Sequence, residues 1–443
     1  MPPKVFQVKR GWLADQTSRL DAAAYGEGGL AARDRIKAGP WPWCPLEKLG
    51  EIYLPPRFSR RYVRDPSRGV RFLSSSDMLL ADLHGLPLLS RRAMLDLHPL
   101  TGTAGSTLVS RSGTIGRTAY WRDEMHDMAV SEHVIHVRPI RSRVLAGYLF
   151  AFLTSELAQA MIRQHTFGSV VQHIQPHHLA TLPVPLPEAP DQRRIHDLVD
   201  GAAAKRTEAS RLLDEASAFF DAQAGPLRWS YEHSLALRIV RRSELNARLD
   251  GFHHVGWAIE TLQEGGAAVA DLGEVISTPR VPRIYAARGV PFLSGIDIFR
   301  ARPTIRVRLA RHVAERFGAF ISAGELAIQG SGQRYGLLGR AAFVGRRLDG
   351  WAASHDLFRI HLHSKVDAGR IYAFLRSEVG RRAMLRHSYG TSIPHVSPTG
   401  IAKLRIPELP APLTDGANQA LQLREQADAD EERAIREVEA WLS

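Results

Sequence analysis

The chain contains one long segment twice. Residues 147–187 begin GYLFAFLTSE and residues 369–410 begin GRIYAFLRSE, and the two copies align at one constant offset over nearly their full length. Matching positions include Ala151-Phe152-Leu153 with Ala373-Phe374-Leu375, Ser155-Glu156 with Ser377-Glu378, Gly168 with Gly390, and Pro176 with Pro398. Two copies this far apart indicate a duplicated domain rather than a solenoid, whose repeats recur every few tens of residues.

The repeat extends upstream with only small changes of offset. Further matches are Arg19-Leu20-Asp21 with Arg248-Leu249-Asp250, Leu49-Gly50-Glu51 with Leu272-Gly273-Glu274, Arg57 with Arg280, GVRFL from Gly69 with GVPFL from Gly289, RTAYW from Arg117 with RAAFV from Arg340, and Ser131 with Ser354. We therefore predict a first domain over 1–187 and a second over 226–410. The segments that follow each domain, 188–225 and 411–443, have a different residue pattern and are treated separately below.

Within each copy the local pattern is mixed. Short β-branched and aromatic runs at 134–137, 341–344 and 357–360, bounded by Gly, Ser and Asp, predict strands. The apolar spacing of 146–164 and 368–387 predicts helices. The segments LPVPLP and LRIPELP are expected to end the domains, because proline cannot donate to a ladder or continue a helix. The predicted fold class is α+β, present twice in tandem.

Long amphipathic helices are predicted after each domain. In 188–224 apolar residues recur at three and four, among them Ile195, Val199, Leu213 and Phe220, which is a stripe narrow enough for a coiled-coil seam. Residues 414–442 repeat the pattern, although Arg424 and Glu431 interrupt the stripe. Neither helix can bury its stripe alone, so we expect the two to pack against each other.

The charge balance favours a polyanionic partner. The chain has 443 residues with 58 Lys and Arg against 46 Asp and Glu, a formal charge of +12. Such a surplus also serves solubility, but a basic surface is the usual electrostatic signature of phosphate binding. The single cysteine, Cys44, excludes an internal disulfide and a thiolate metal cage. We found no signal peptide and no apolar run of membrane-spanning length, so we expect a soluble, cytoplasmic protein with no membrane partner.

Catalytic motifs are weak throughout the sequence. The turn at 102–106 lacks the lysine of a P-loop, and the glycines at 330–332 lack the βαβ frame of a dinucleotide site. His173, His177 and His178 have no carboxylate or cysteine at the spacing of a metal site, so a domain rim or DNA backbone suits them better. The sequence also lacks a Ser/His/Asp arrangement, a nuclease-like acidic cluster and the Asn/Asp-Pro-Pro-aromatic motif of nucleic-acid amino-methyltransferases. We therefore expect a non-catalytic binding protein with no cofactor and no metal.

Two recurring segments are candidates for DNA contact. The first is a basic loop with interleaved tyrosine, comprising Arg57, Arg60, Arg61, Tyr62 and Arg64 in one copy and Arg280, Arg283 and Tyr285 in the other. Arginine can bind guanine or phosphate, and tyrosine can pack on sugar or base. One such loop alone is equally consistent with a solvated surface, but its recurrence at the matching place favours binding.

The second candidate is a glycine-rich turn. It carries Ser110, Arg111 and Ser112 in the first copy and Gln333, Arg334 and Tyr335 in the second. Glycines let backbone N–H groups approach phosphates closely, and the arginines and Gln333 are long enough to reach base edges. A hairpin turn that merely needs positive φ explains the same glycines, and both interpretations remain open.

Taken together, these features resemble the specificity (S) subunits of type I restriction–modification systems. The resemblance rests on two domains that open with Arg-Leu-Asp, the SRSGTIG turn, the closing leucine–proline segment and the domain–helix–domain–helix order. It implies two target recognition domains, each reading one half of a split double-stranded DNA site. It also implies an antiparallel helical spacer that docks methyltransferase (M) subunits, two in number, and a separate restriction/translocase (R) subunit that cuts DNA.

Two alternative functions remain open for a chain with these features. A related phage-defence system could use the same scaffold with different partner enzymes, and a self-contained DNA-modifying enzyme would modify DNA without partners. Because the residues of the candidate loops differ between the copies, the two halves of the site are expected to differ in sequence.

Overall fold

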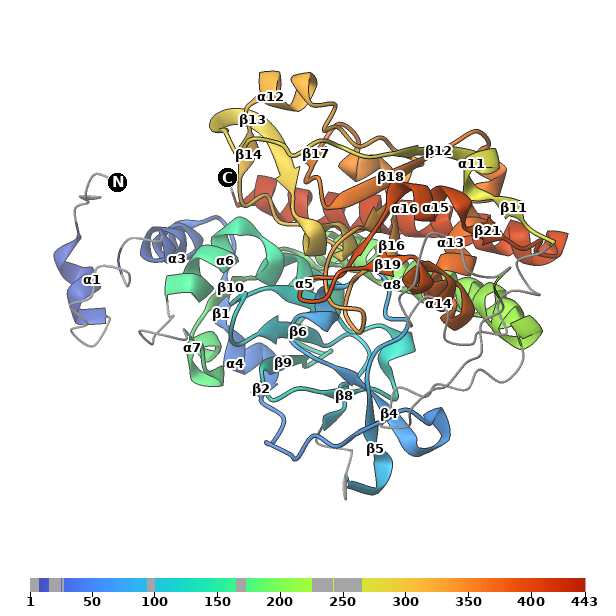
Figure 1. Ribbon diagram of the computed structural model, residues 1–443. Helices are drawn as coiled ribbons and strands as arrows, with labels where there is room; N and C mark the ends of the chain where they lie inside the picture. The colour runs from blue at the N-terminus through green and yellow to red at the C-terminus, as the bar shows by residue number, and fades with distance from the viewer. Residues whose placement is uncertain are drawn as a thin grey trace. The chain divides into compact units, whose positions relative to one another are not determined.

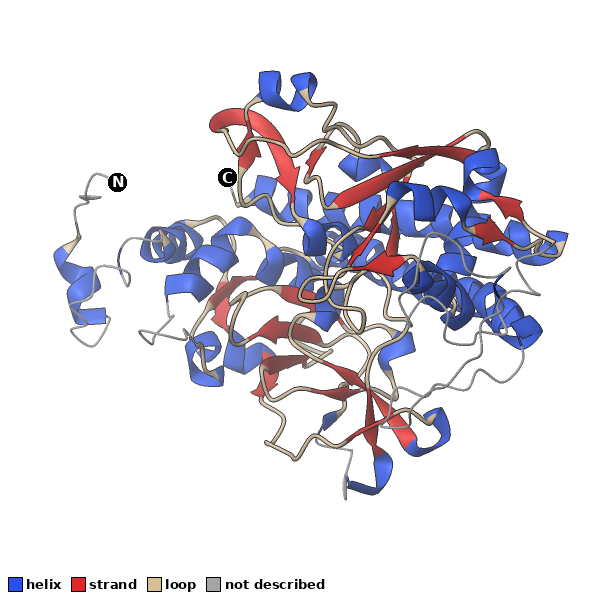
Figure 2. Ribbon diagram, viewed as in Figure 1, coloured by secondary structure: helices blue, strands red, loops and turns tan. Residues whose placement is uncertain are grey.

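The computed structural model describes residues 8–15, 25, 28–93, 100–164, 173–224, 242 and 265–442. The two Arg-Leu-Asp motifs and Gly168 lie outside the described residues. The chain divides into two compact units. The first comprises Met1–Thr207 with Gln426–Ser443, and the second comprises Glu208–Glu425. Each unit contains both helices and strands (Figure 2).

The first unit is built on a four-stranded antiparallel sheet with the order β2-β9-β6-β7. Its strands are β2 (Gly50–Tyr53), β9 (Val134–Pro139), β6 (Thr107–Ser110) and β7 (Thr118–Tyr120). The central strands β6 and β9 are buried on both faces, which fits their β-branched sequences TLVS and VIHV. The predicted strand at 134–137 is confirmed.

The second unit repeats this sheet strand for strand, in the order β12-β18-β15-β16. The strands are β12 (Gly273–Ile276), β18 (Leu357–Leu362), β15 (Leu326–Gln329) and β16 (Ala341–Phe343). The same order in both units confirms the duplicated α+β fold predicted from the repeat.

A smaller sheet accompanies each central sheet. In the first unit it has the order β3-β5-β4-β8, formed by β3 (Tyr62–Val63), β5 (Leu88–Ser90), β4 (Gly69–Leu73) and β8 (Ala129–Val130). In the second unit the order is β14-β13-β17, formed by β14 (Arg308–Leu309), β13 (Tyr285–Leu293) and β17 (Ala352–Ala353). Each small sheet contains one parallel pair, β4 with β8 and β13 with β17, directly before the aligned residues Ser131 and Ser354.

The helices predicted over 146–164 and 368–387 form, but each is broken by a serine. The first is α5 (Ala146–Thr154) and α6 (Glu156–Gln164), and the second is α13 (Ala368–Arg376) and α14 (Glu378–Arg386). Ser155 and Ser377 leave the helical region with ψ of 155° and 159°. The Ser377 hydroxyl accepts from the Gly380 N–H at 3.0 Å, so it starts a new helix as an N-cap. Our prediction of one continuous helix per copy was wrong.

The proline-rich segments LPVPLP and LRIPELP contain short strands. β10 (Pro183–Pro185) pairs with β1 (Trp43–Pro45), and β21 (Arg405–Ile406) pairs with β11 (Ala267–Ala268). Each pair is an isolated two-stranded ladder, where proline is tolerated because a strand edge is free. The remaining helices include α3 (Gly29–Ala38), α4 (Leu46–Leu49), α7 (Pro176–Ala180), α11 (Val269–Leu272), α12 (Arg311–Arg316) and α15 (Pro398–Lys403).

Both predicted long helices are present, as α8 (Ala189–Ala224) and α16 (Ala411–Trp441) (Figure 1). Each helix contributes one part to each unit, because the unit boundaries fall after Thr207 and after Glu425. Ile195 and Val199 of α8 enter the core of the first unit together with Val438 of α16. In the second unit Phe220 of α8 packs at 5.3 Å, edge to face, on Phe374 of α13.

The repeat determines how the domain helices dock on the long helices. In the first unit the Gly147 N–H donates to His196 Nδ1 of α8 at 3.1 Å. In the second unit the Gly369 N–H donates to Asn418 Oδ1 of α16 at 2.9 Å. A Cβ at Gly147 would lie 2.8 Å from the His196 backbone, and one at Gly369 would lie 2.5 Å from the Asn418 nitrogen. Glycine is needed at both aligned positions because the helices approach this closely.

The buried positions of α8 follow a heptad pattern. One series is Ile195, Val199, Ala202 and Arg206 in the first unit, then Ala209, Leu213, Ala216 and Phe220 in the second, and Ala203, Ser210 and Ser217 beside it are buried too. The alternating spacing of four and three is that of a coiled-coil seam. Arg206 occupies one seam position, and its guanidinium pairs with Glu431 and Asp428 of α16. The glutamate that interrupts the apolar stripe of α16 therefore has a buried cation opposite it.

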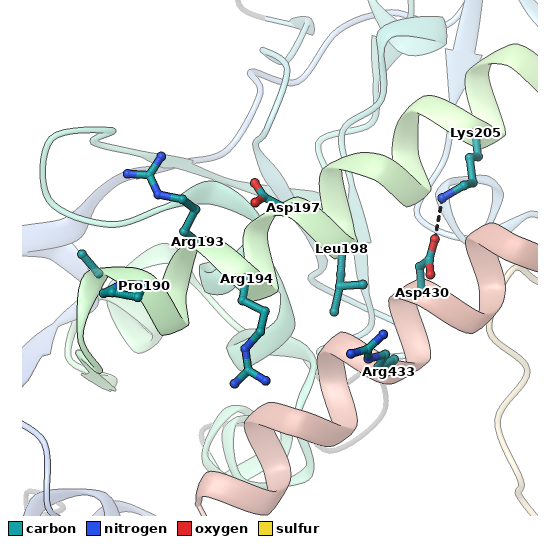
Figure 3. A pocket seen from close by; sticks show the side chains of 9 residues that line it. Pro190, Arg193, Arg194, Asp197, Leu198, Lys205, Asp430 and Arg433 are labelled. Carbon is teal, nitrogen blue, oxygen red and sulfur yellow. Dashed lines mark hydrogen bonds and ion pairs between the residues drawn. The ribbon is translucent and has the colours of Figure 1, made fainter.

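Additional ion pairs join the two helices within the first unit. Lys205 Nζ lies 2.6 Å from Asp430 Oδ2, and Arg194 Nη1 lies 3.0 Å from Glu437 Oε2. The residue numbers of the partners rise along α8 while they fall along α16, so the two helices run antiparallel here. Beside this seam is a groove of about 740 Å³ whose lining includes Arg193 and Arg433 (Figure 3). In Figure 3 the Lys205 side chain reaches across to Asp430, whereas Arg193 points away from α16.

Candidate nucleic-acid interface

The basic loop of the first unit connects β2 to β3. Arg57, Arg60, Arg61 and Arg64 are all exposed, as is Tyr62 at the start of β3. Arg60 pairs with groups of the protein on its inner side. Its Nη2 donates to Glu132 Oε2 at 2.8 Å and Oε1 at 2.9 Å, and its guanidinium lies 5.1 Å from the Phe72 ring centre.

The basic loop of the second unit connects β12 to β13. Arg280, Arg283 and Tyr285 are exposed, and between the arginines Val281 is buried in the core of the small sheet. A buried valine followed by Pro282, whose ring fixes φ, anchors this part of the loop. The two arginines and His355 line a pocket of about 430 Å³.

The glycine-rich turn of the first unit is the hairpin between β6 and β7. Gly113 and Gly116 have φ of 75° and 80°, so positive φ is required at both. The Ser110 hydroxyl donates to the Thr114 carbonyl and accepts from the Arg117 N–H at 2.9 Å. Ser110 is buried and closes the turn, whereas Arg111 and Ser112 are partly exposed. The hairpin interpretation of these glycines is confirmed, and DNA contact by this turn remains a prediction.

The corresponding hairpin of the second unit lies between β15 and β16 and is longer. The Gln329 N–H donates to Arg340 O at 2.9 Å, where the first unit has the Ser110 N–H donating to Arg117 O at 2.8 Å. The additional residues fall at the tip, next to Tyr335, which is 88% exposed. Gln333 bonds to the Ser392 carbonyl at 3.3 Å, and Arg334 Nε donates to Ser388 Oγ at 2.9 Å. Tyr335 therefore projects from a turn that is otherwise fixed to the protein.

A third segment, absent from our predictions, joins the two candidates in each unit. In the first unit Glu132 contacts Arg60 of the basic loop, while His133 Nδ1 lies 3.0 Å from Ser112 Oγ of the turn. In the second unit Asp356 Oδ1 accepts from Ser331 Oγ at 2.8 Å. His355, next to Asp356, lines the pocket with the loop arginines. The basic loop and the turn thus belong to one surface in each unit.

The sequence held a signal for this third segment. Ser131 and Ser354 are aligned in the repeat, and the two residues after them are Glu-His in one copy and His-Asp in the other. Polar residues thus differ between aligned positions beside the two candidate loops.

The ionisation of the third segment follows from its surroundings. Burial acts to raise the pKa of Glu132, but the Arg60 hydrogen bonds and charge outweigh burial and hold that pKa below its usual value. Burial lowers the pKa of His133, and the cations Arg60 and Arg111 lower it further against the opposing effect of Glu132. At neutral pH the first unit therefore presents a carboxylate paired with Arg60 and a neutral imidazole.

Other candidate chemistry is sparse in the described part of the chain. Among the residues at 8–15, 25, 28–93, 100–164, 173–224, 242 and 265–442, no three His, Cys, Asp or Glu side chains lie together as they would around a metal ion. His178 Nδ1 accepts from the Gln175 N–H at 3.1 Å and caps α7. No helix in these same ranges has both the length and the apolar character to cross a membrane.

One part of the chain is similar to a known family of DNA specificity domains. Residues 103–208, which include the first glycine-rich turn, match the family model of the type I restriction modification DNA specificity domain. This part of the chain is thus similar to the type I restriction–modification specificity family, and the resemblance drawn from the sequence is confirmed. No curated protein shows a significant sequence match to the chain.

Solved structures give weaker likenesses. The S subunit of a type I system from M. genitalium is 11% identical, with a TM-score of 0.31 and coverage of 91% of this chain and 96% of that chain. The HsdS subunit from Thermoanaerobacter tengcongensis is 14% identical, with a TM-score of 0.27 and coverage of 91% and 95%. A structure whose description concerns complex assembly and conformational transition of the type I R-M system is 14% identical, with a TM-score of 0.28 and coverage of 91% and 94%. TM-scores this low carry no argument about function.

Proposed function

We propose that this chain is the non-catalytic, DNA-recognition subunit of a type I restriction–modification complex. Each unit reads one half of a bipartite duplex target, with residues 1–187 and 226–410 as the reading domains. The observation that carries the proposal is the surface present in both units, where a basic loop and a glycine-rich turn are joined through one short segment. The framework is the same and the side chains differ, as expected of two readers of different sequences.

Direct contacts are assigned to the side chains that the protein leaves exposed. In the first unit these are Arg57, Arg61, Tyr62 and Arg64 of the basic loop. In the second unit they are Arg280, Arg283 and Tyr285 of the basic loop, together with Tyr335 of the turn. Arg60 holds its loop in shape through Glu132. Arg111, Ser112, Gln333 and Arg334 hold the turns in shape and contact DNA from positions fixed by the protein. Ser110 supports the turn from beneath.

The long helices act as a spacer and as the docking site for methyltransferase subunits. The groove beside the first-unit seam places cations next to the acids Asp197 and Asp430, which suits a partner helix of mixed charge. The methyltransferase subunits, two in number, supply S-adenosylmethionine chemistry, so this chain itself needs no cofactor. A restriction/translocase subunit completes the complex.

The test is purification of the chain with its partners from the native host, combined with methylation mapping of the host genome. We expect methyltransferase subunits to co-purify and the methylated sequences to share a split motif with an unspecified gap. The chain alone should neither methylate nor cleave DNA when given S-adenosylmethionine or Mg²⁺. Activity of the chain alone, or co-purification with enzymes of another class, would contradict the proposal.

The division of labour has its own test. Arg57 and Arg61 replaced by alanine should weaken recognition of one half-site only, and Arg280 and Arg283 replaced by alanine should weaken recognition of the other half-site only. Weaker recognition of both half-sites from one pair of substitutions would rule out two separate readers.

A further inference from the structure

The two units place different side chains beside equivalent arginines. Arg60 and Arg283 occupy the same place in the repeat, two residues before the aligned tyrosines Tyr62 and Tyr285. The position after the aligned serine is Glu132 in the first unit and His355 in the second. The same position therefore carries a carboxylate side chain in one unit and an imidazole in the other.

In the first unit the arginine is already neutralised by the protein. Both oxygens of Glu132 accept from Arg60 Nη2, at 2.8 and 2.9 Å, and Ser131 Oγ accepts from the same nitrogen at 3.3 Å. The Glu132 side chain is only 16% exposed, so solvent screens this pair weakly. A phosphate that approached Arg60 would meet the Glu132 carboxylate.

In the second unit the arginines have no such carboxylate. The pocket is lined by Arg280, Val281, Pro282, Arg283 and His355, and none of these is an acid. Across the part of the chain that the structure describes, neither Arg280 nor Arg283 forms an ion pair. The nearby acid, Asp356, is turned toward the glycine-rich turn, where it accepts from Ser331 Oγ at 2.8 Å.

We propose that the Arg280–Arg283–His355 pocket binds a backbone phosphate of duplex DNA, and that the residue at position 132 or 355 decides whether the loop arginine is available for such a contact. The proposal rests on the proposed function and adds a ligand-binding residue, His355, and a controlling residue, Glu132. Both guanidinium groups and the His355 imidazole line the same pocket, which offers an anion donors from three side chains. A phosphodiester matches the donor geometry of arginine, and the imidazole adds one further N–H.

The test measures binding of the full-length chain to a fluorescent duplex between about 50 and 200 mM salt. Affinity falls as salt rises, and each phosphate contact adds about one unit to the magnitude of the slope of log K against log salt. The word slope below means this magnitude. His355→Glu should reproduce the first-unit ion pair and lower the slope by about one unit. His363→Glu, the same change at an exposed position at the other end of β18, should leave the slope equal to that of the wild type. Glu132→Gln should release Arg60 and raise the slope by about one unit.

The outcomes separate this proposal from the proposed function. Wild-type binding that is insensitive to salt would contradict DNA recognition as a whole. Salt-dependent wild-type binding with equal slopes for His355→Glu and His363→Glu would overturn the phosphate pocket alone. If thermal unfolding shows that His355→Glu is not folded, Arg283→Gln replaces it and should lose the same unit of slope. Inorganic phosphate could raise the melting temperature of the wild type but not of the His355→Glu variant, while both proteins bind the duplex with equal salt slopes. That result would assign the pocket to a free anion and overturn the proposal.

Discussion

The guanidinium of Arg206 on α8 and the carboxylate of Glu431 on α16 form an ion pair inside the helix seam, with side chains only 7% and 8% exposed. Arg206 also lies 2.7 Å from Asp428, and the two acids raise the pKa of the guanidinium although burial opposes them. Within this part of the first unit the flanking seam positions Ala202 and Ala434 are apolar. A buried pair at one heptad position fixes which residues face each other, because any shift leaves a charge among apolar side chains.

Replacing Glu431 alone should therefore be costly. Glu431→Leu leaves Arg206 buried with only Asp428 beside it, and we expect a loss of about 3 kcal/mol in the free energy of unfolding, near the lower end for a broken buried pair. The double variant Arg206→Met/Glu431→Leu should recover most of that loss, since apolar side chains of similar size suit the seam. Urea unfolding of the full-length chain gives both values. Equal stability of the single and double variants would show that the charges do not interact.

The pH dependence of stability is expected to include a contribution from His136. This residue is fully buried in β9, its ring lies 4.9 Å from that of Tyr53, and neither of its nitrogens has a hydrogen-bond partner among the described residues. Burial lowers the pKa of His136 to about 4. The unfolded chain takes up a proton near pH 6.5 while the folded chain does not, so stability is lost as the pH falls from about 6.5 to 4. The full effect is about 3 kcal/mol.

His136→Phe keeps an aromatic ring and removes the titration. We expect unfolding of this variant to lack that share of the acid destabilisation, while His363→Phe, at an exposed position, should keep the wild-type profile. Urea midpoints measured at several values of pH between 4 and 8 provide the comparison. A wild-type-like profile for His136→Phe would place the acid sensitivity elsewhere.

Tyr335 is expected to act on DNA without contributing to stability. Its side chain is 88% exposed at the tip of the second-unit hairpin, so Tyr335→Ala should change the free energy of unfolding by less than about 0.5 kcal/mol. The same substitution should weaken selection at one half of the methylated motif. Tyr335→Phe, which removes only the hydroxyl, distinguishes ring packing from hydrogen bonding. Unchanged methylation in both variants would remove Tyr335 from the reading surface.

Much of this architecture follows from the sequence because duplication supplies an internal comparison. The repeat predicted two α+β domains, and the three-and-four spacing predicted α8 and α16. The serine breaks were missed although Ser155-Glu156 and Ser377-Glu378 were among the aligned pairs. A cap depends on backbone angles at a single residue, and apolar periodicity continues through it.

The candidate surface was only partly predictable for a different reason. Arg57 and Arg280 are recognisable in the sequence because they recur at aligned positions in basic loops. The pairing of Arg60 with Glu132 joins residues 72 positions apart, and local sequence carries no record of such a contact. The same holds for Glu431, which appears as a defect in the α16 stripe until Arg206 is placed opposite it.

The helices should act as a ruler between the two half-sites. α8 is continuous from Ala189 to Ala224, and the unit boundary falls within it after Thr207 and within α16 after Glu425. Four residues inserted at both boundaries lengthen both helices by about 6 Å and turn them by about 40°. Base pairs rise by about 3.4 Å, so two more pairs match the length. Two pairs also turn the duplex by about 70°, close enough to the helix rotation for both units to keep their grooves.

Methylation mapping of cells that carry each variant tests the ruler. The double four-residue insertion should lengthen the unspecified gap by about two base pairs and leave both half-site sequences unchanged, because neither reading surface is altered. Two residues inserted at both boundaries turn the helices by about 200° and should abolish methylation. Four residues inserted in α8 alone shift its seam against α16 and should also abolish it. A gap that stays the same length after the double four-residue insertion, or half-sites that change, would show that α8 and α16 do not set the spacing.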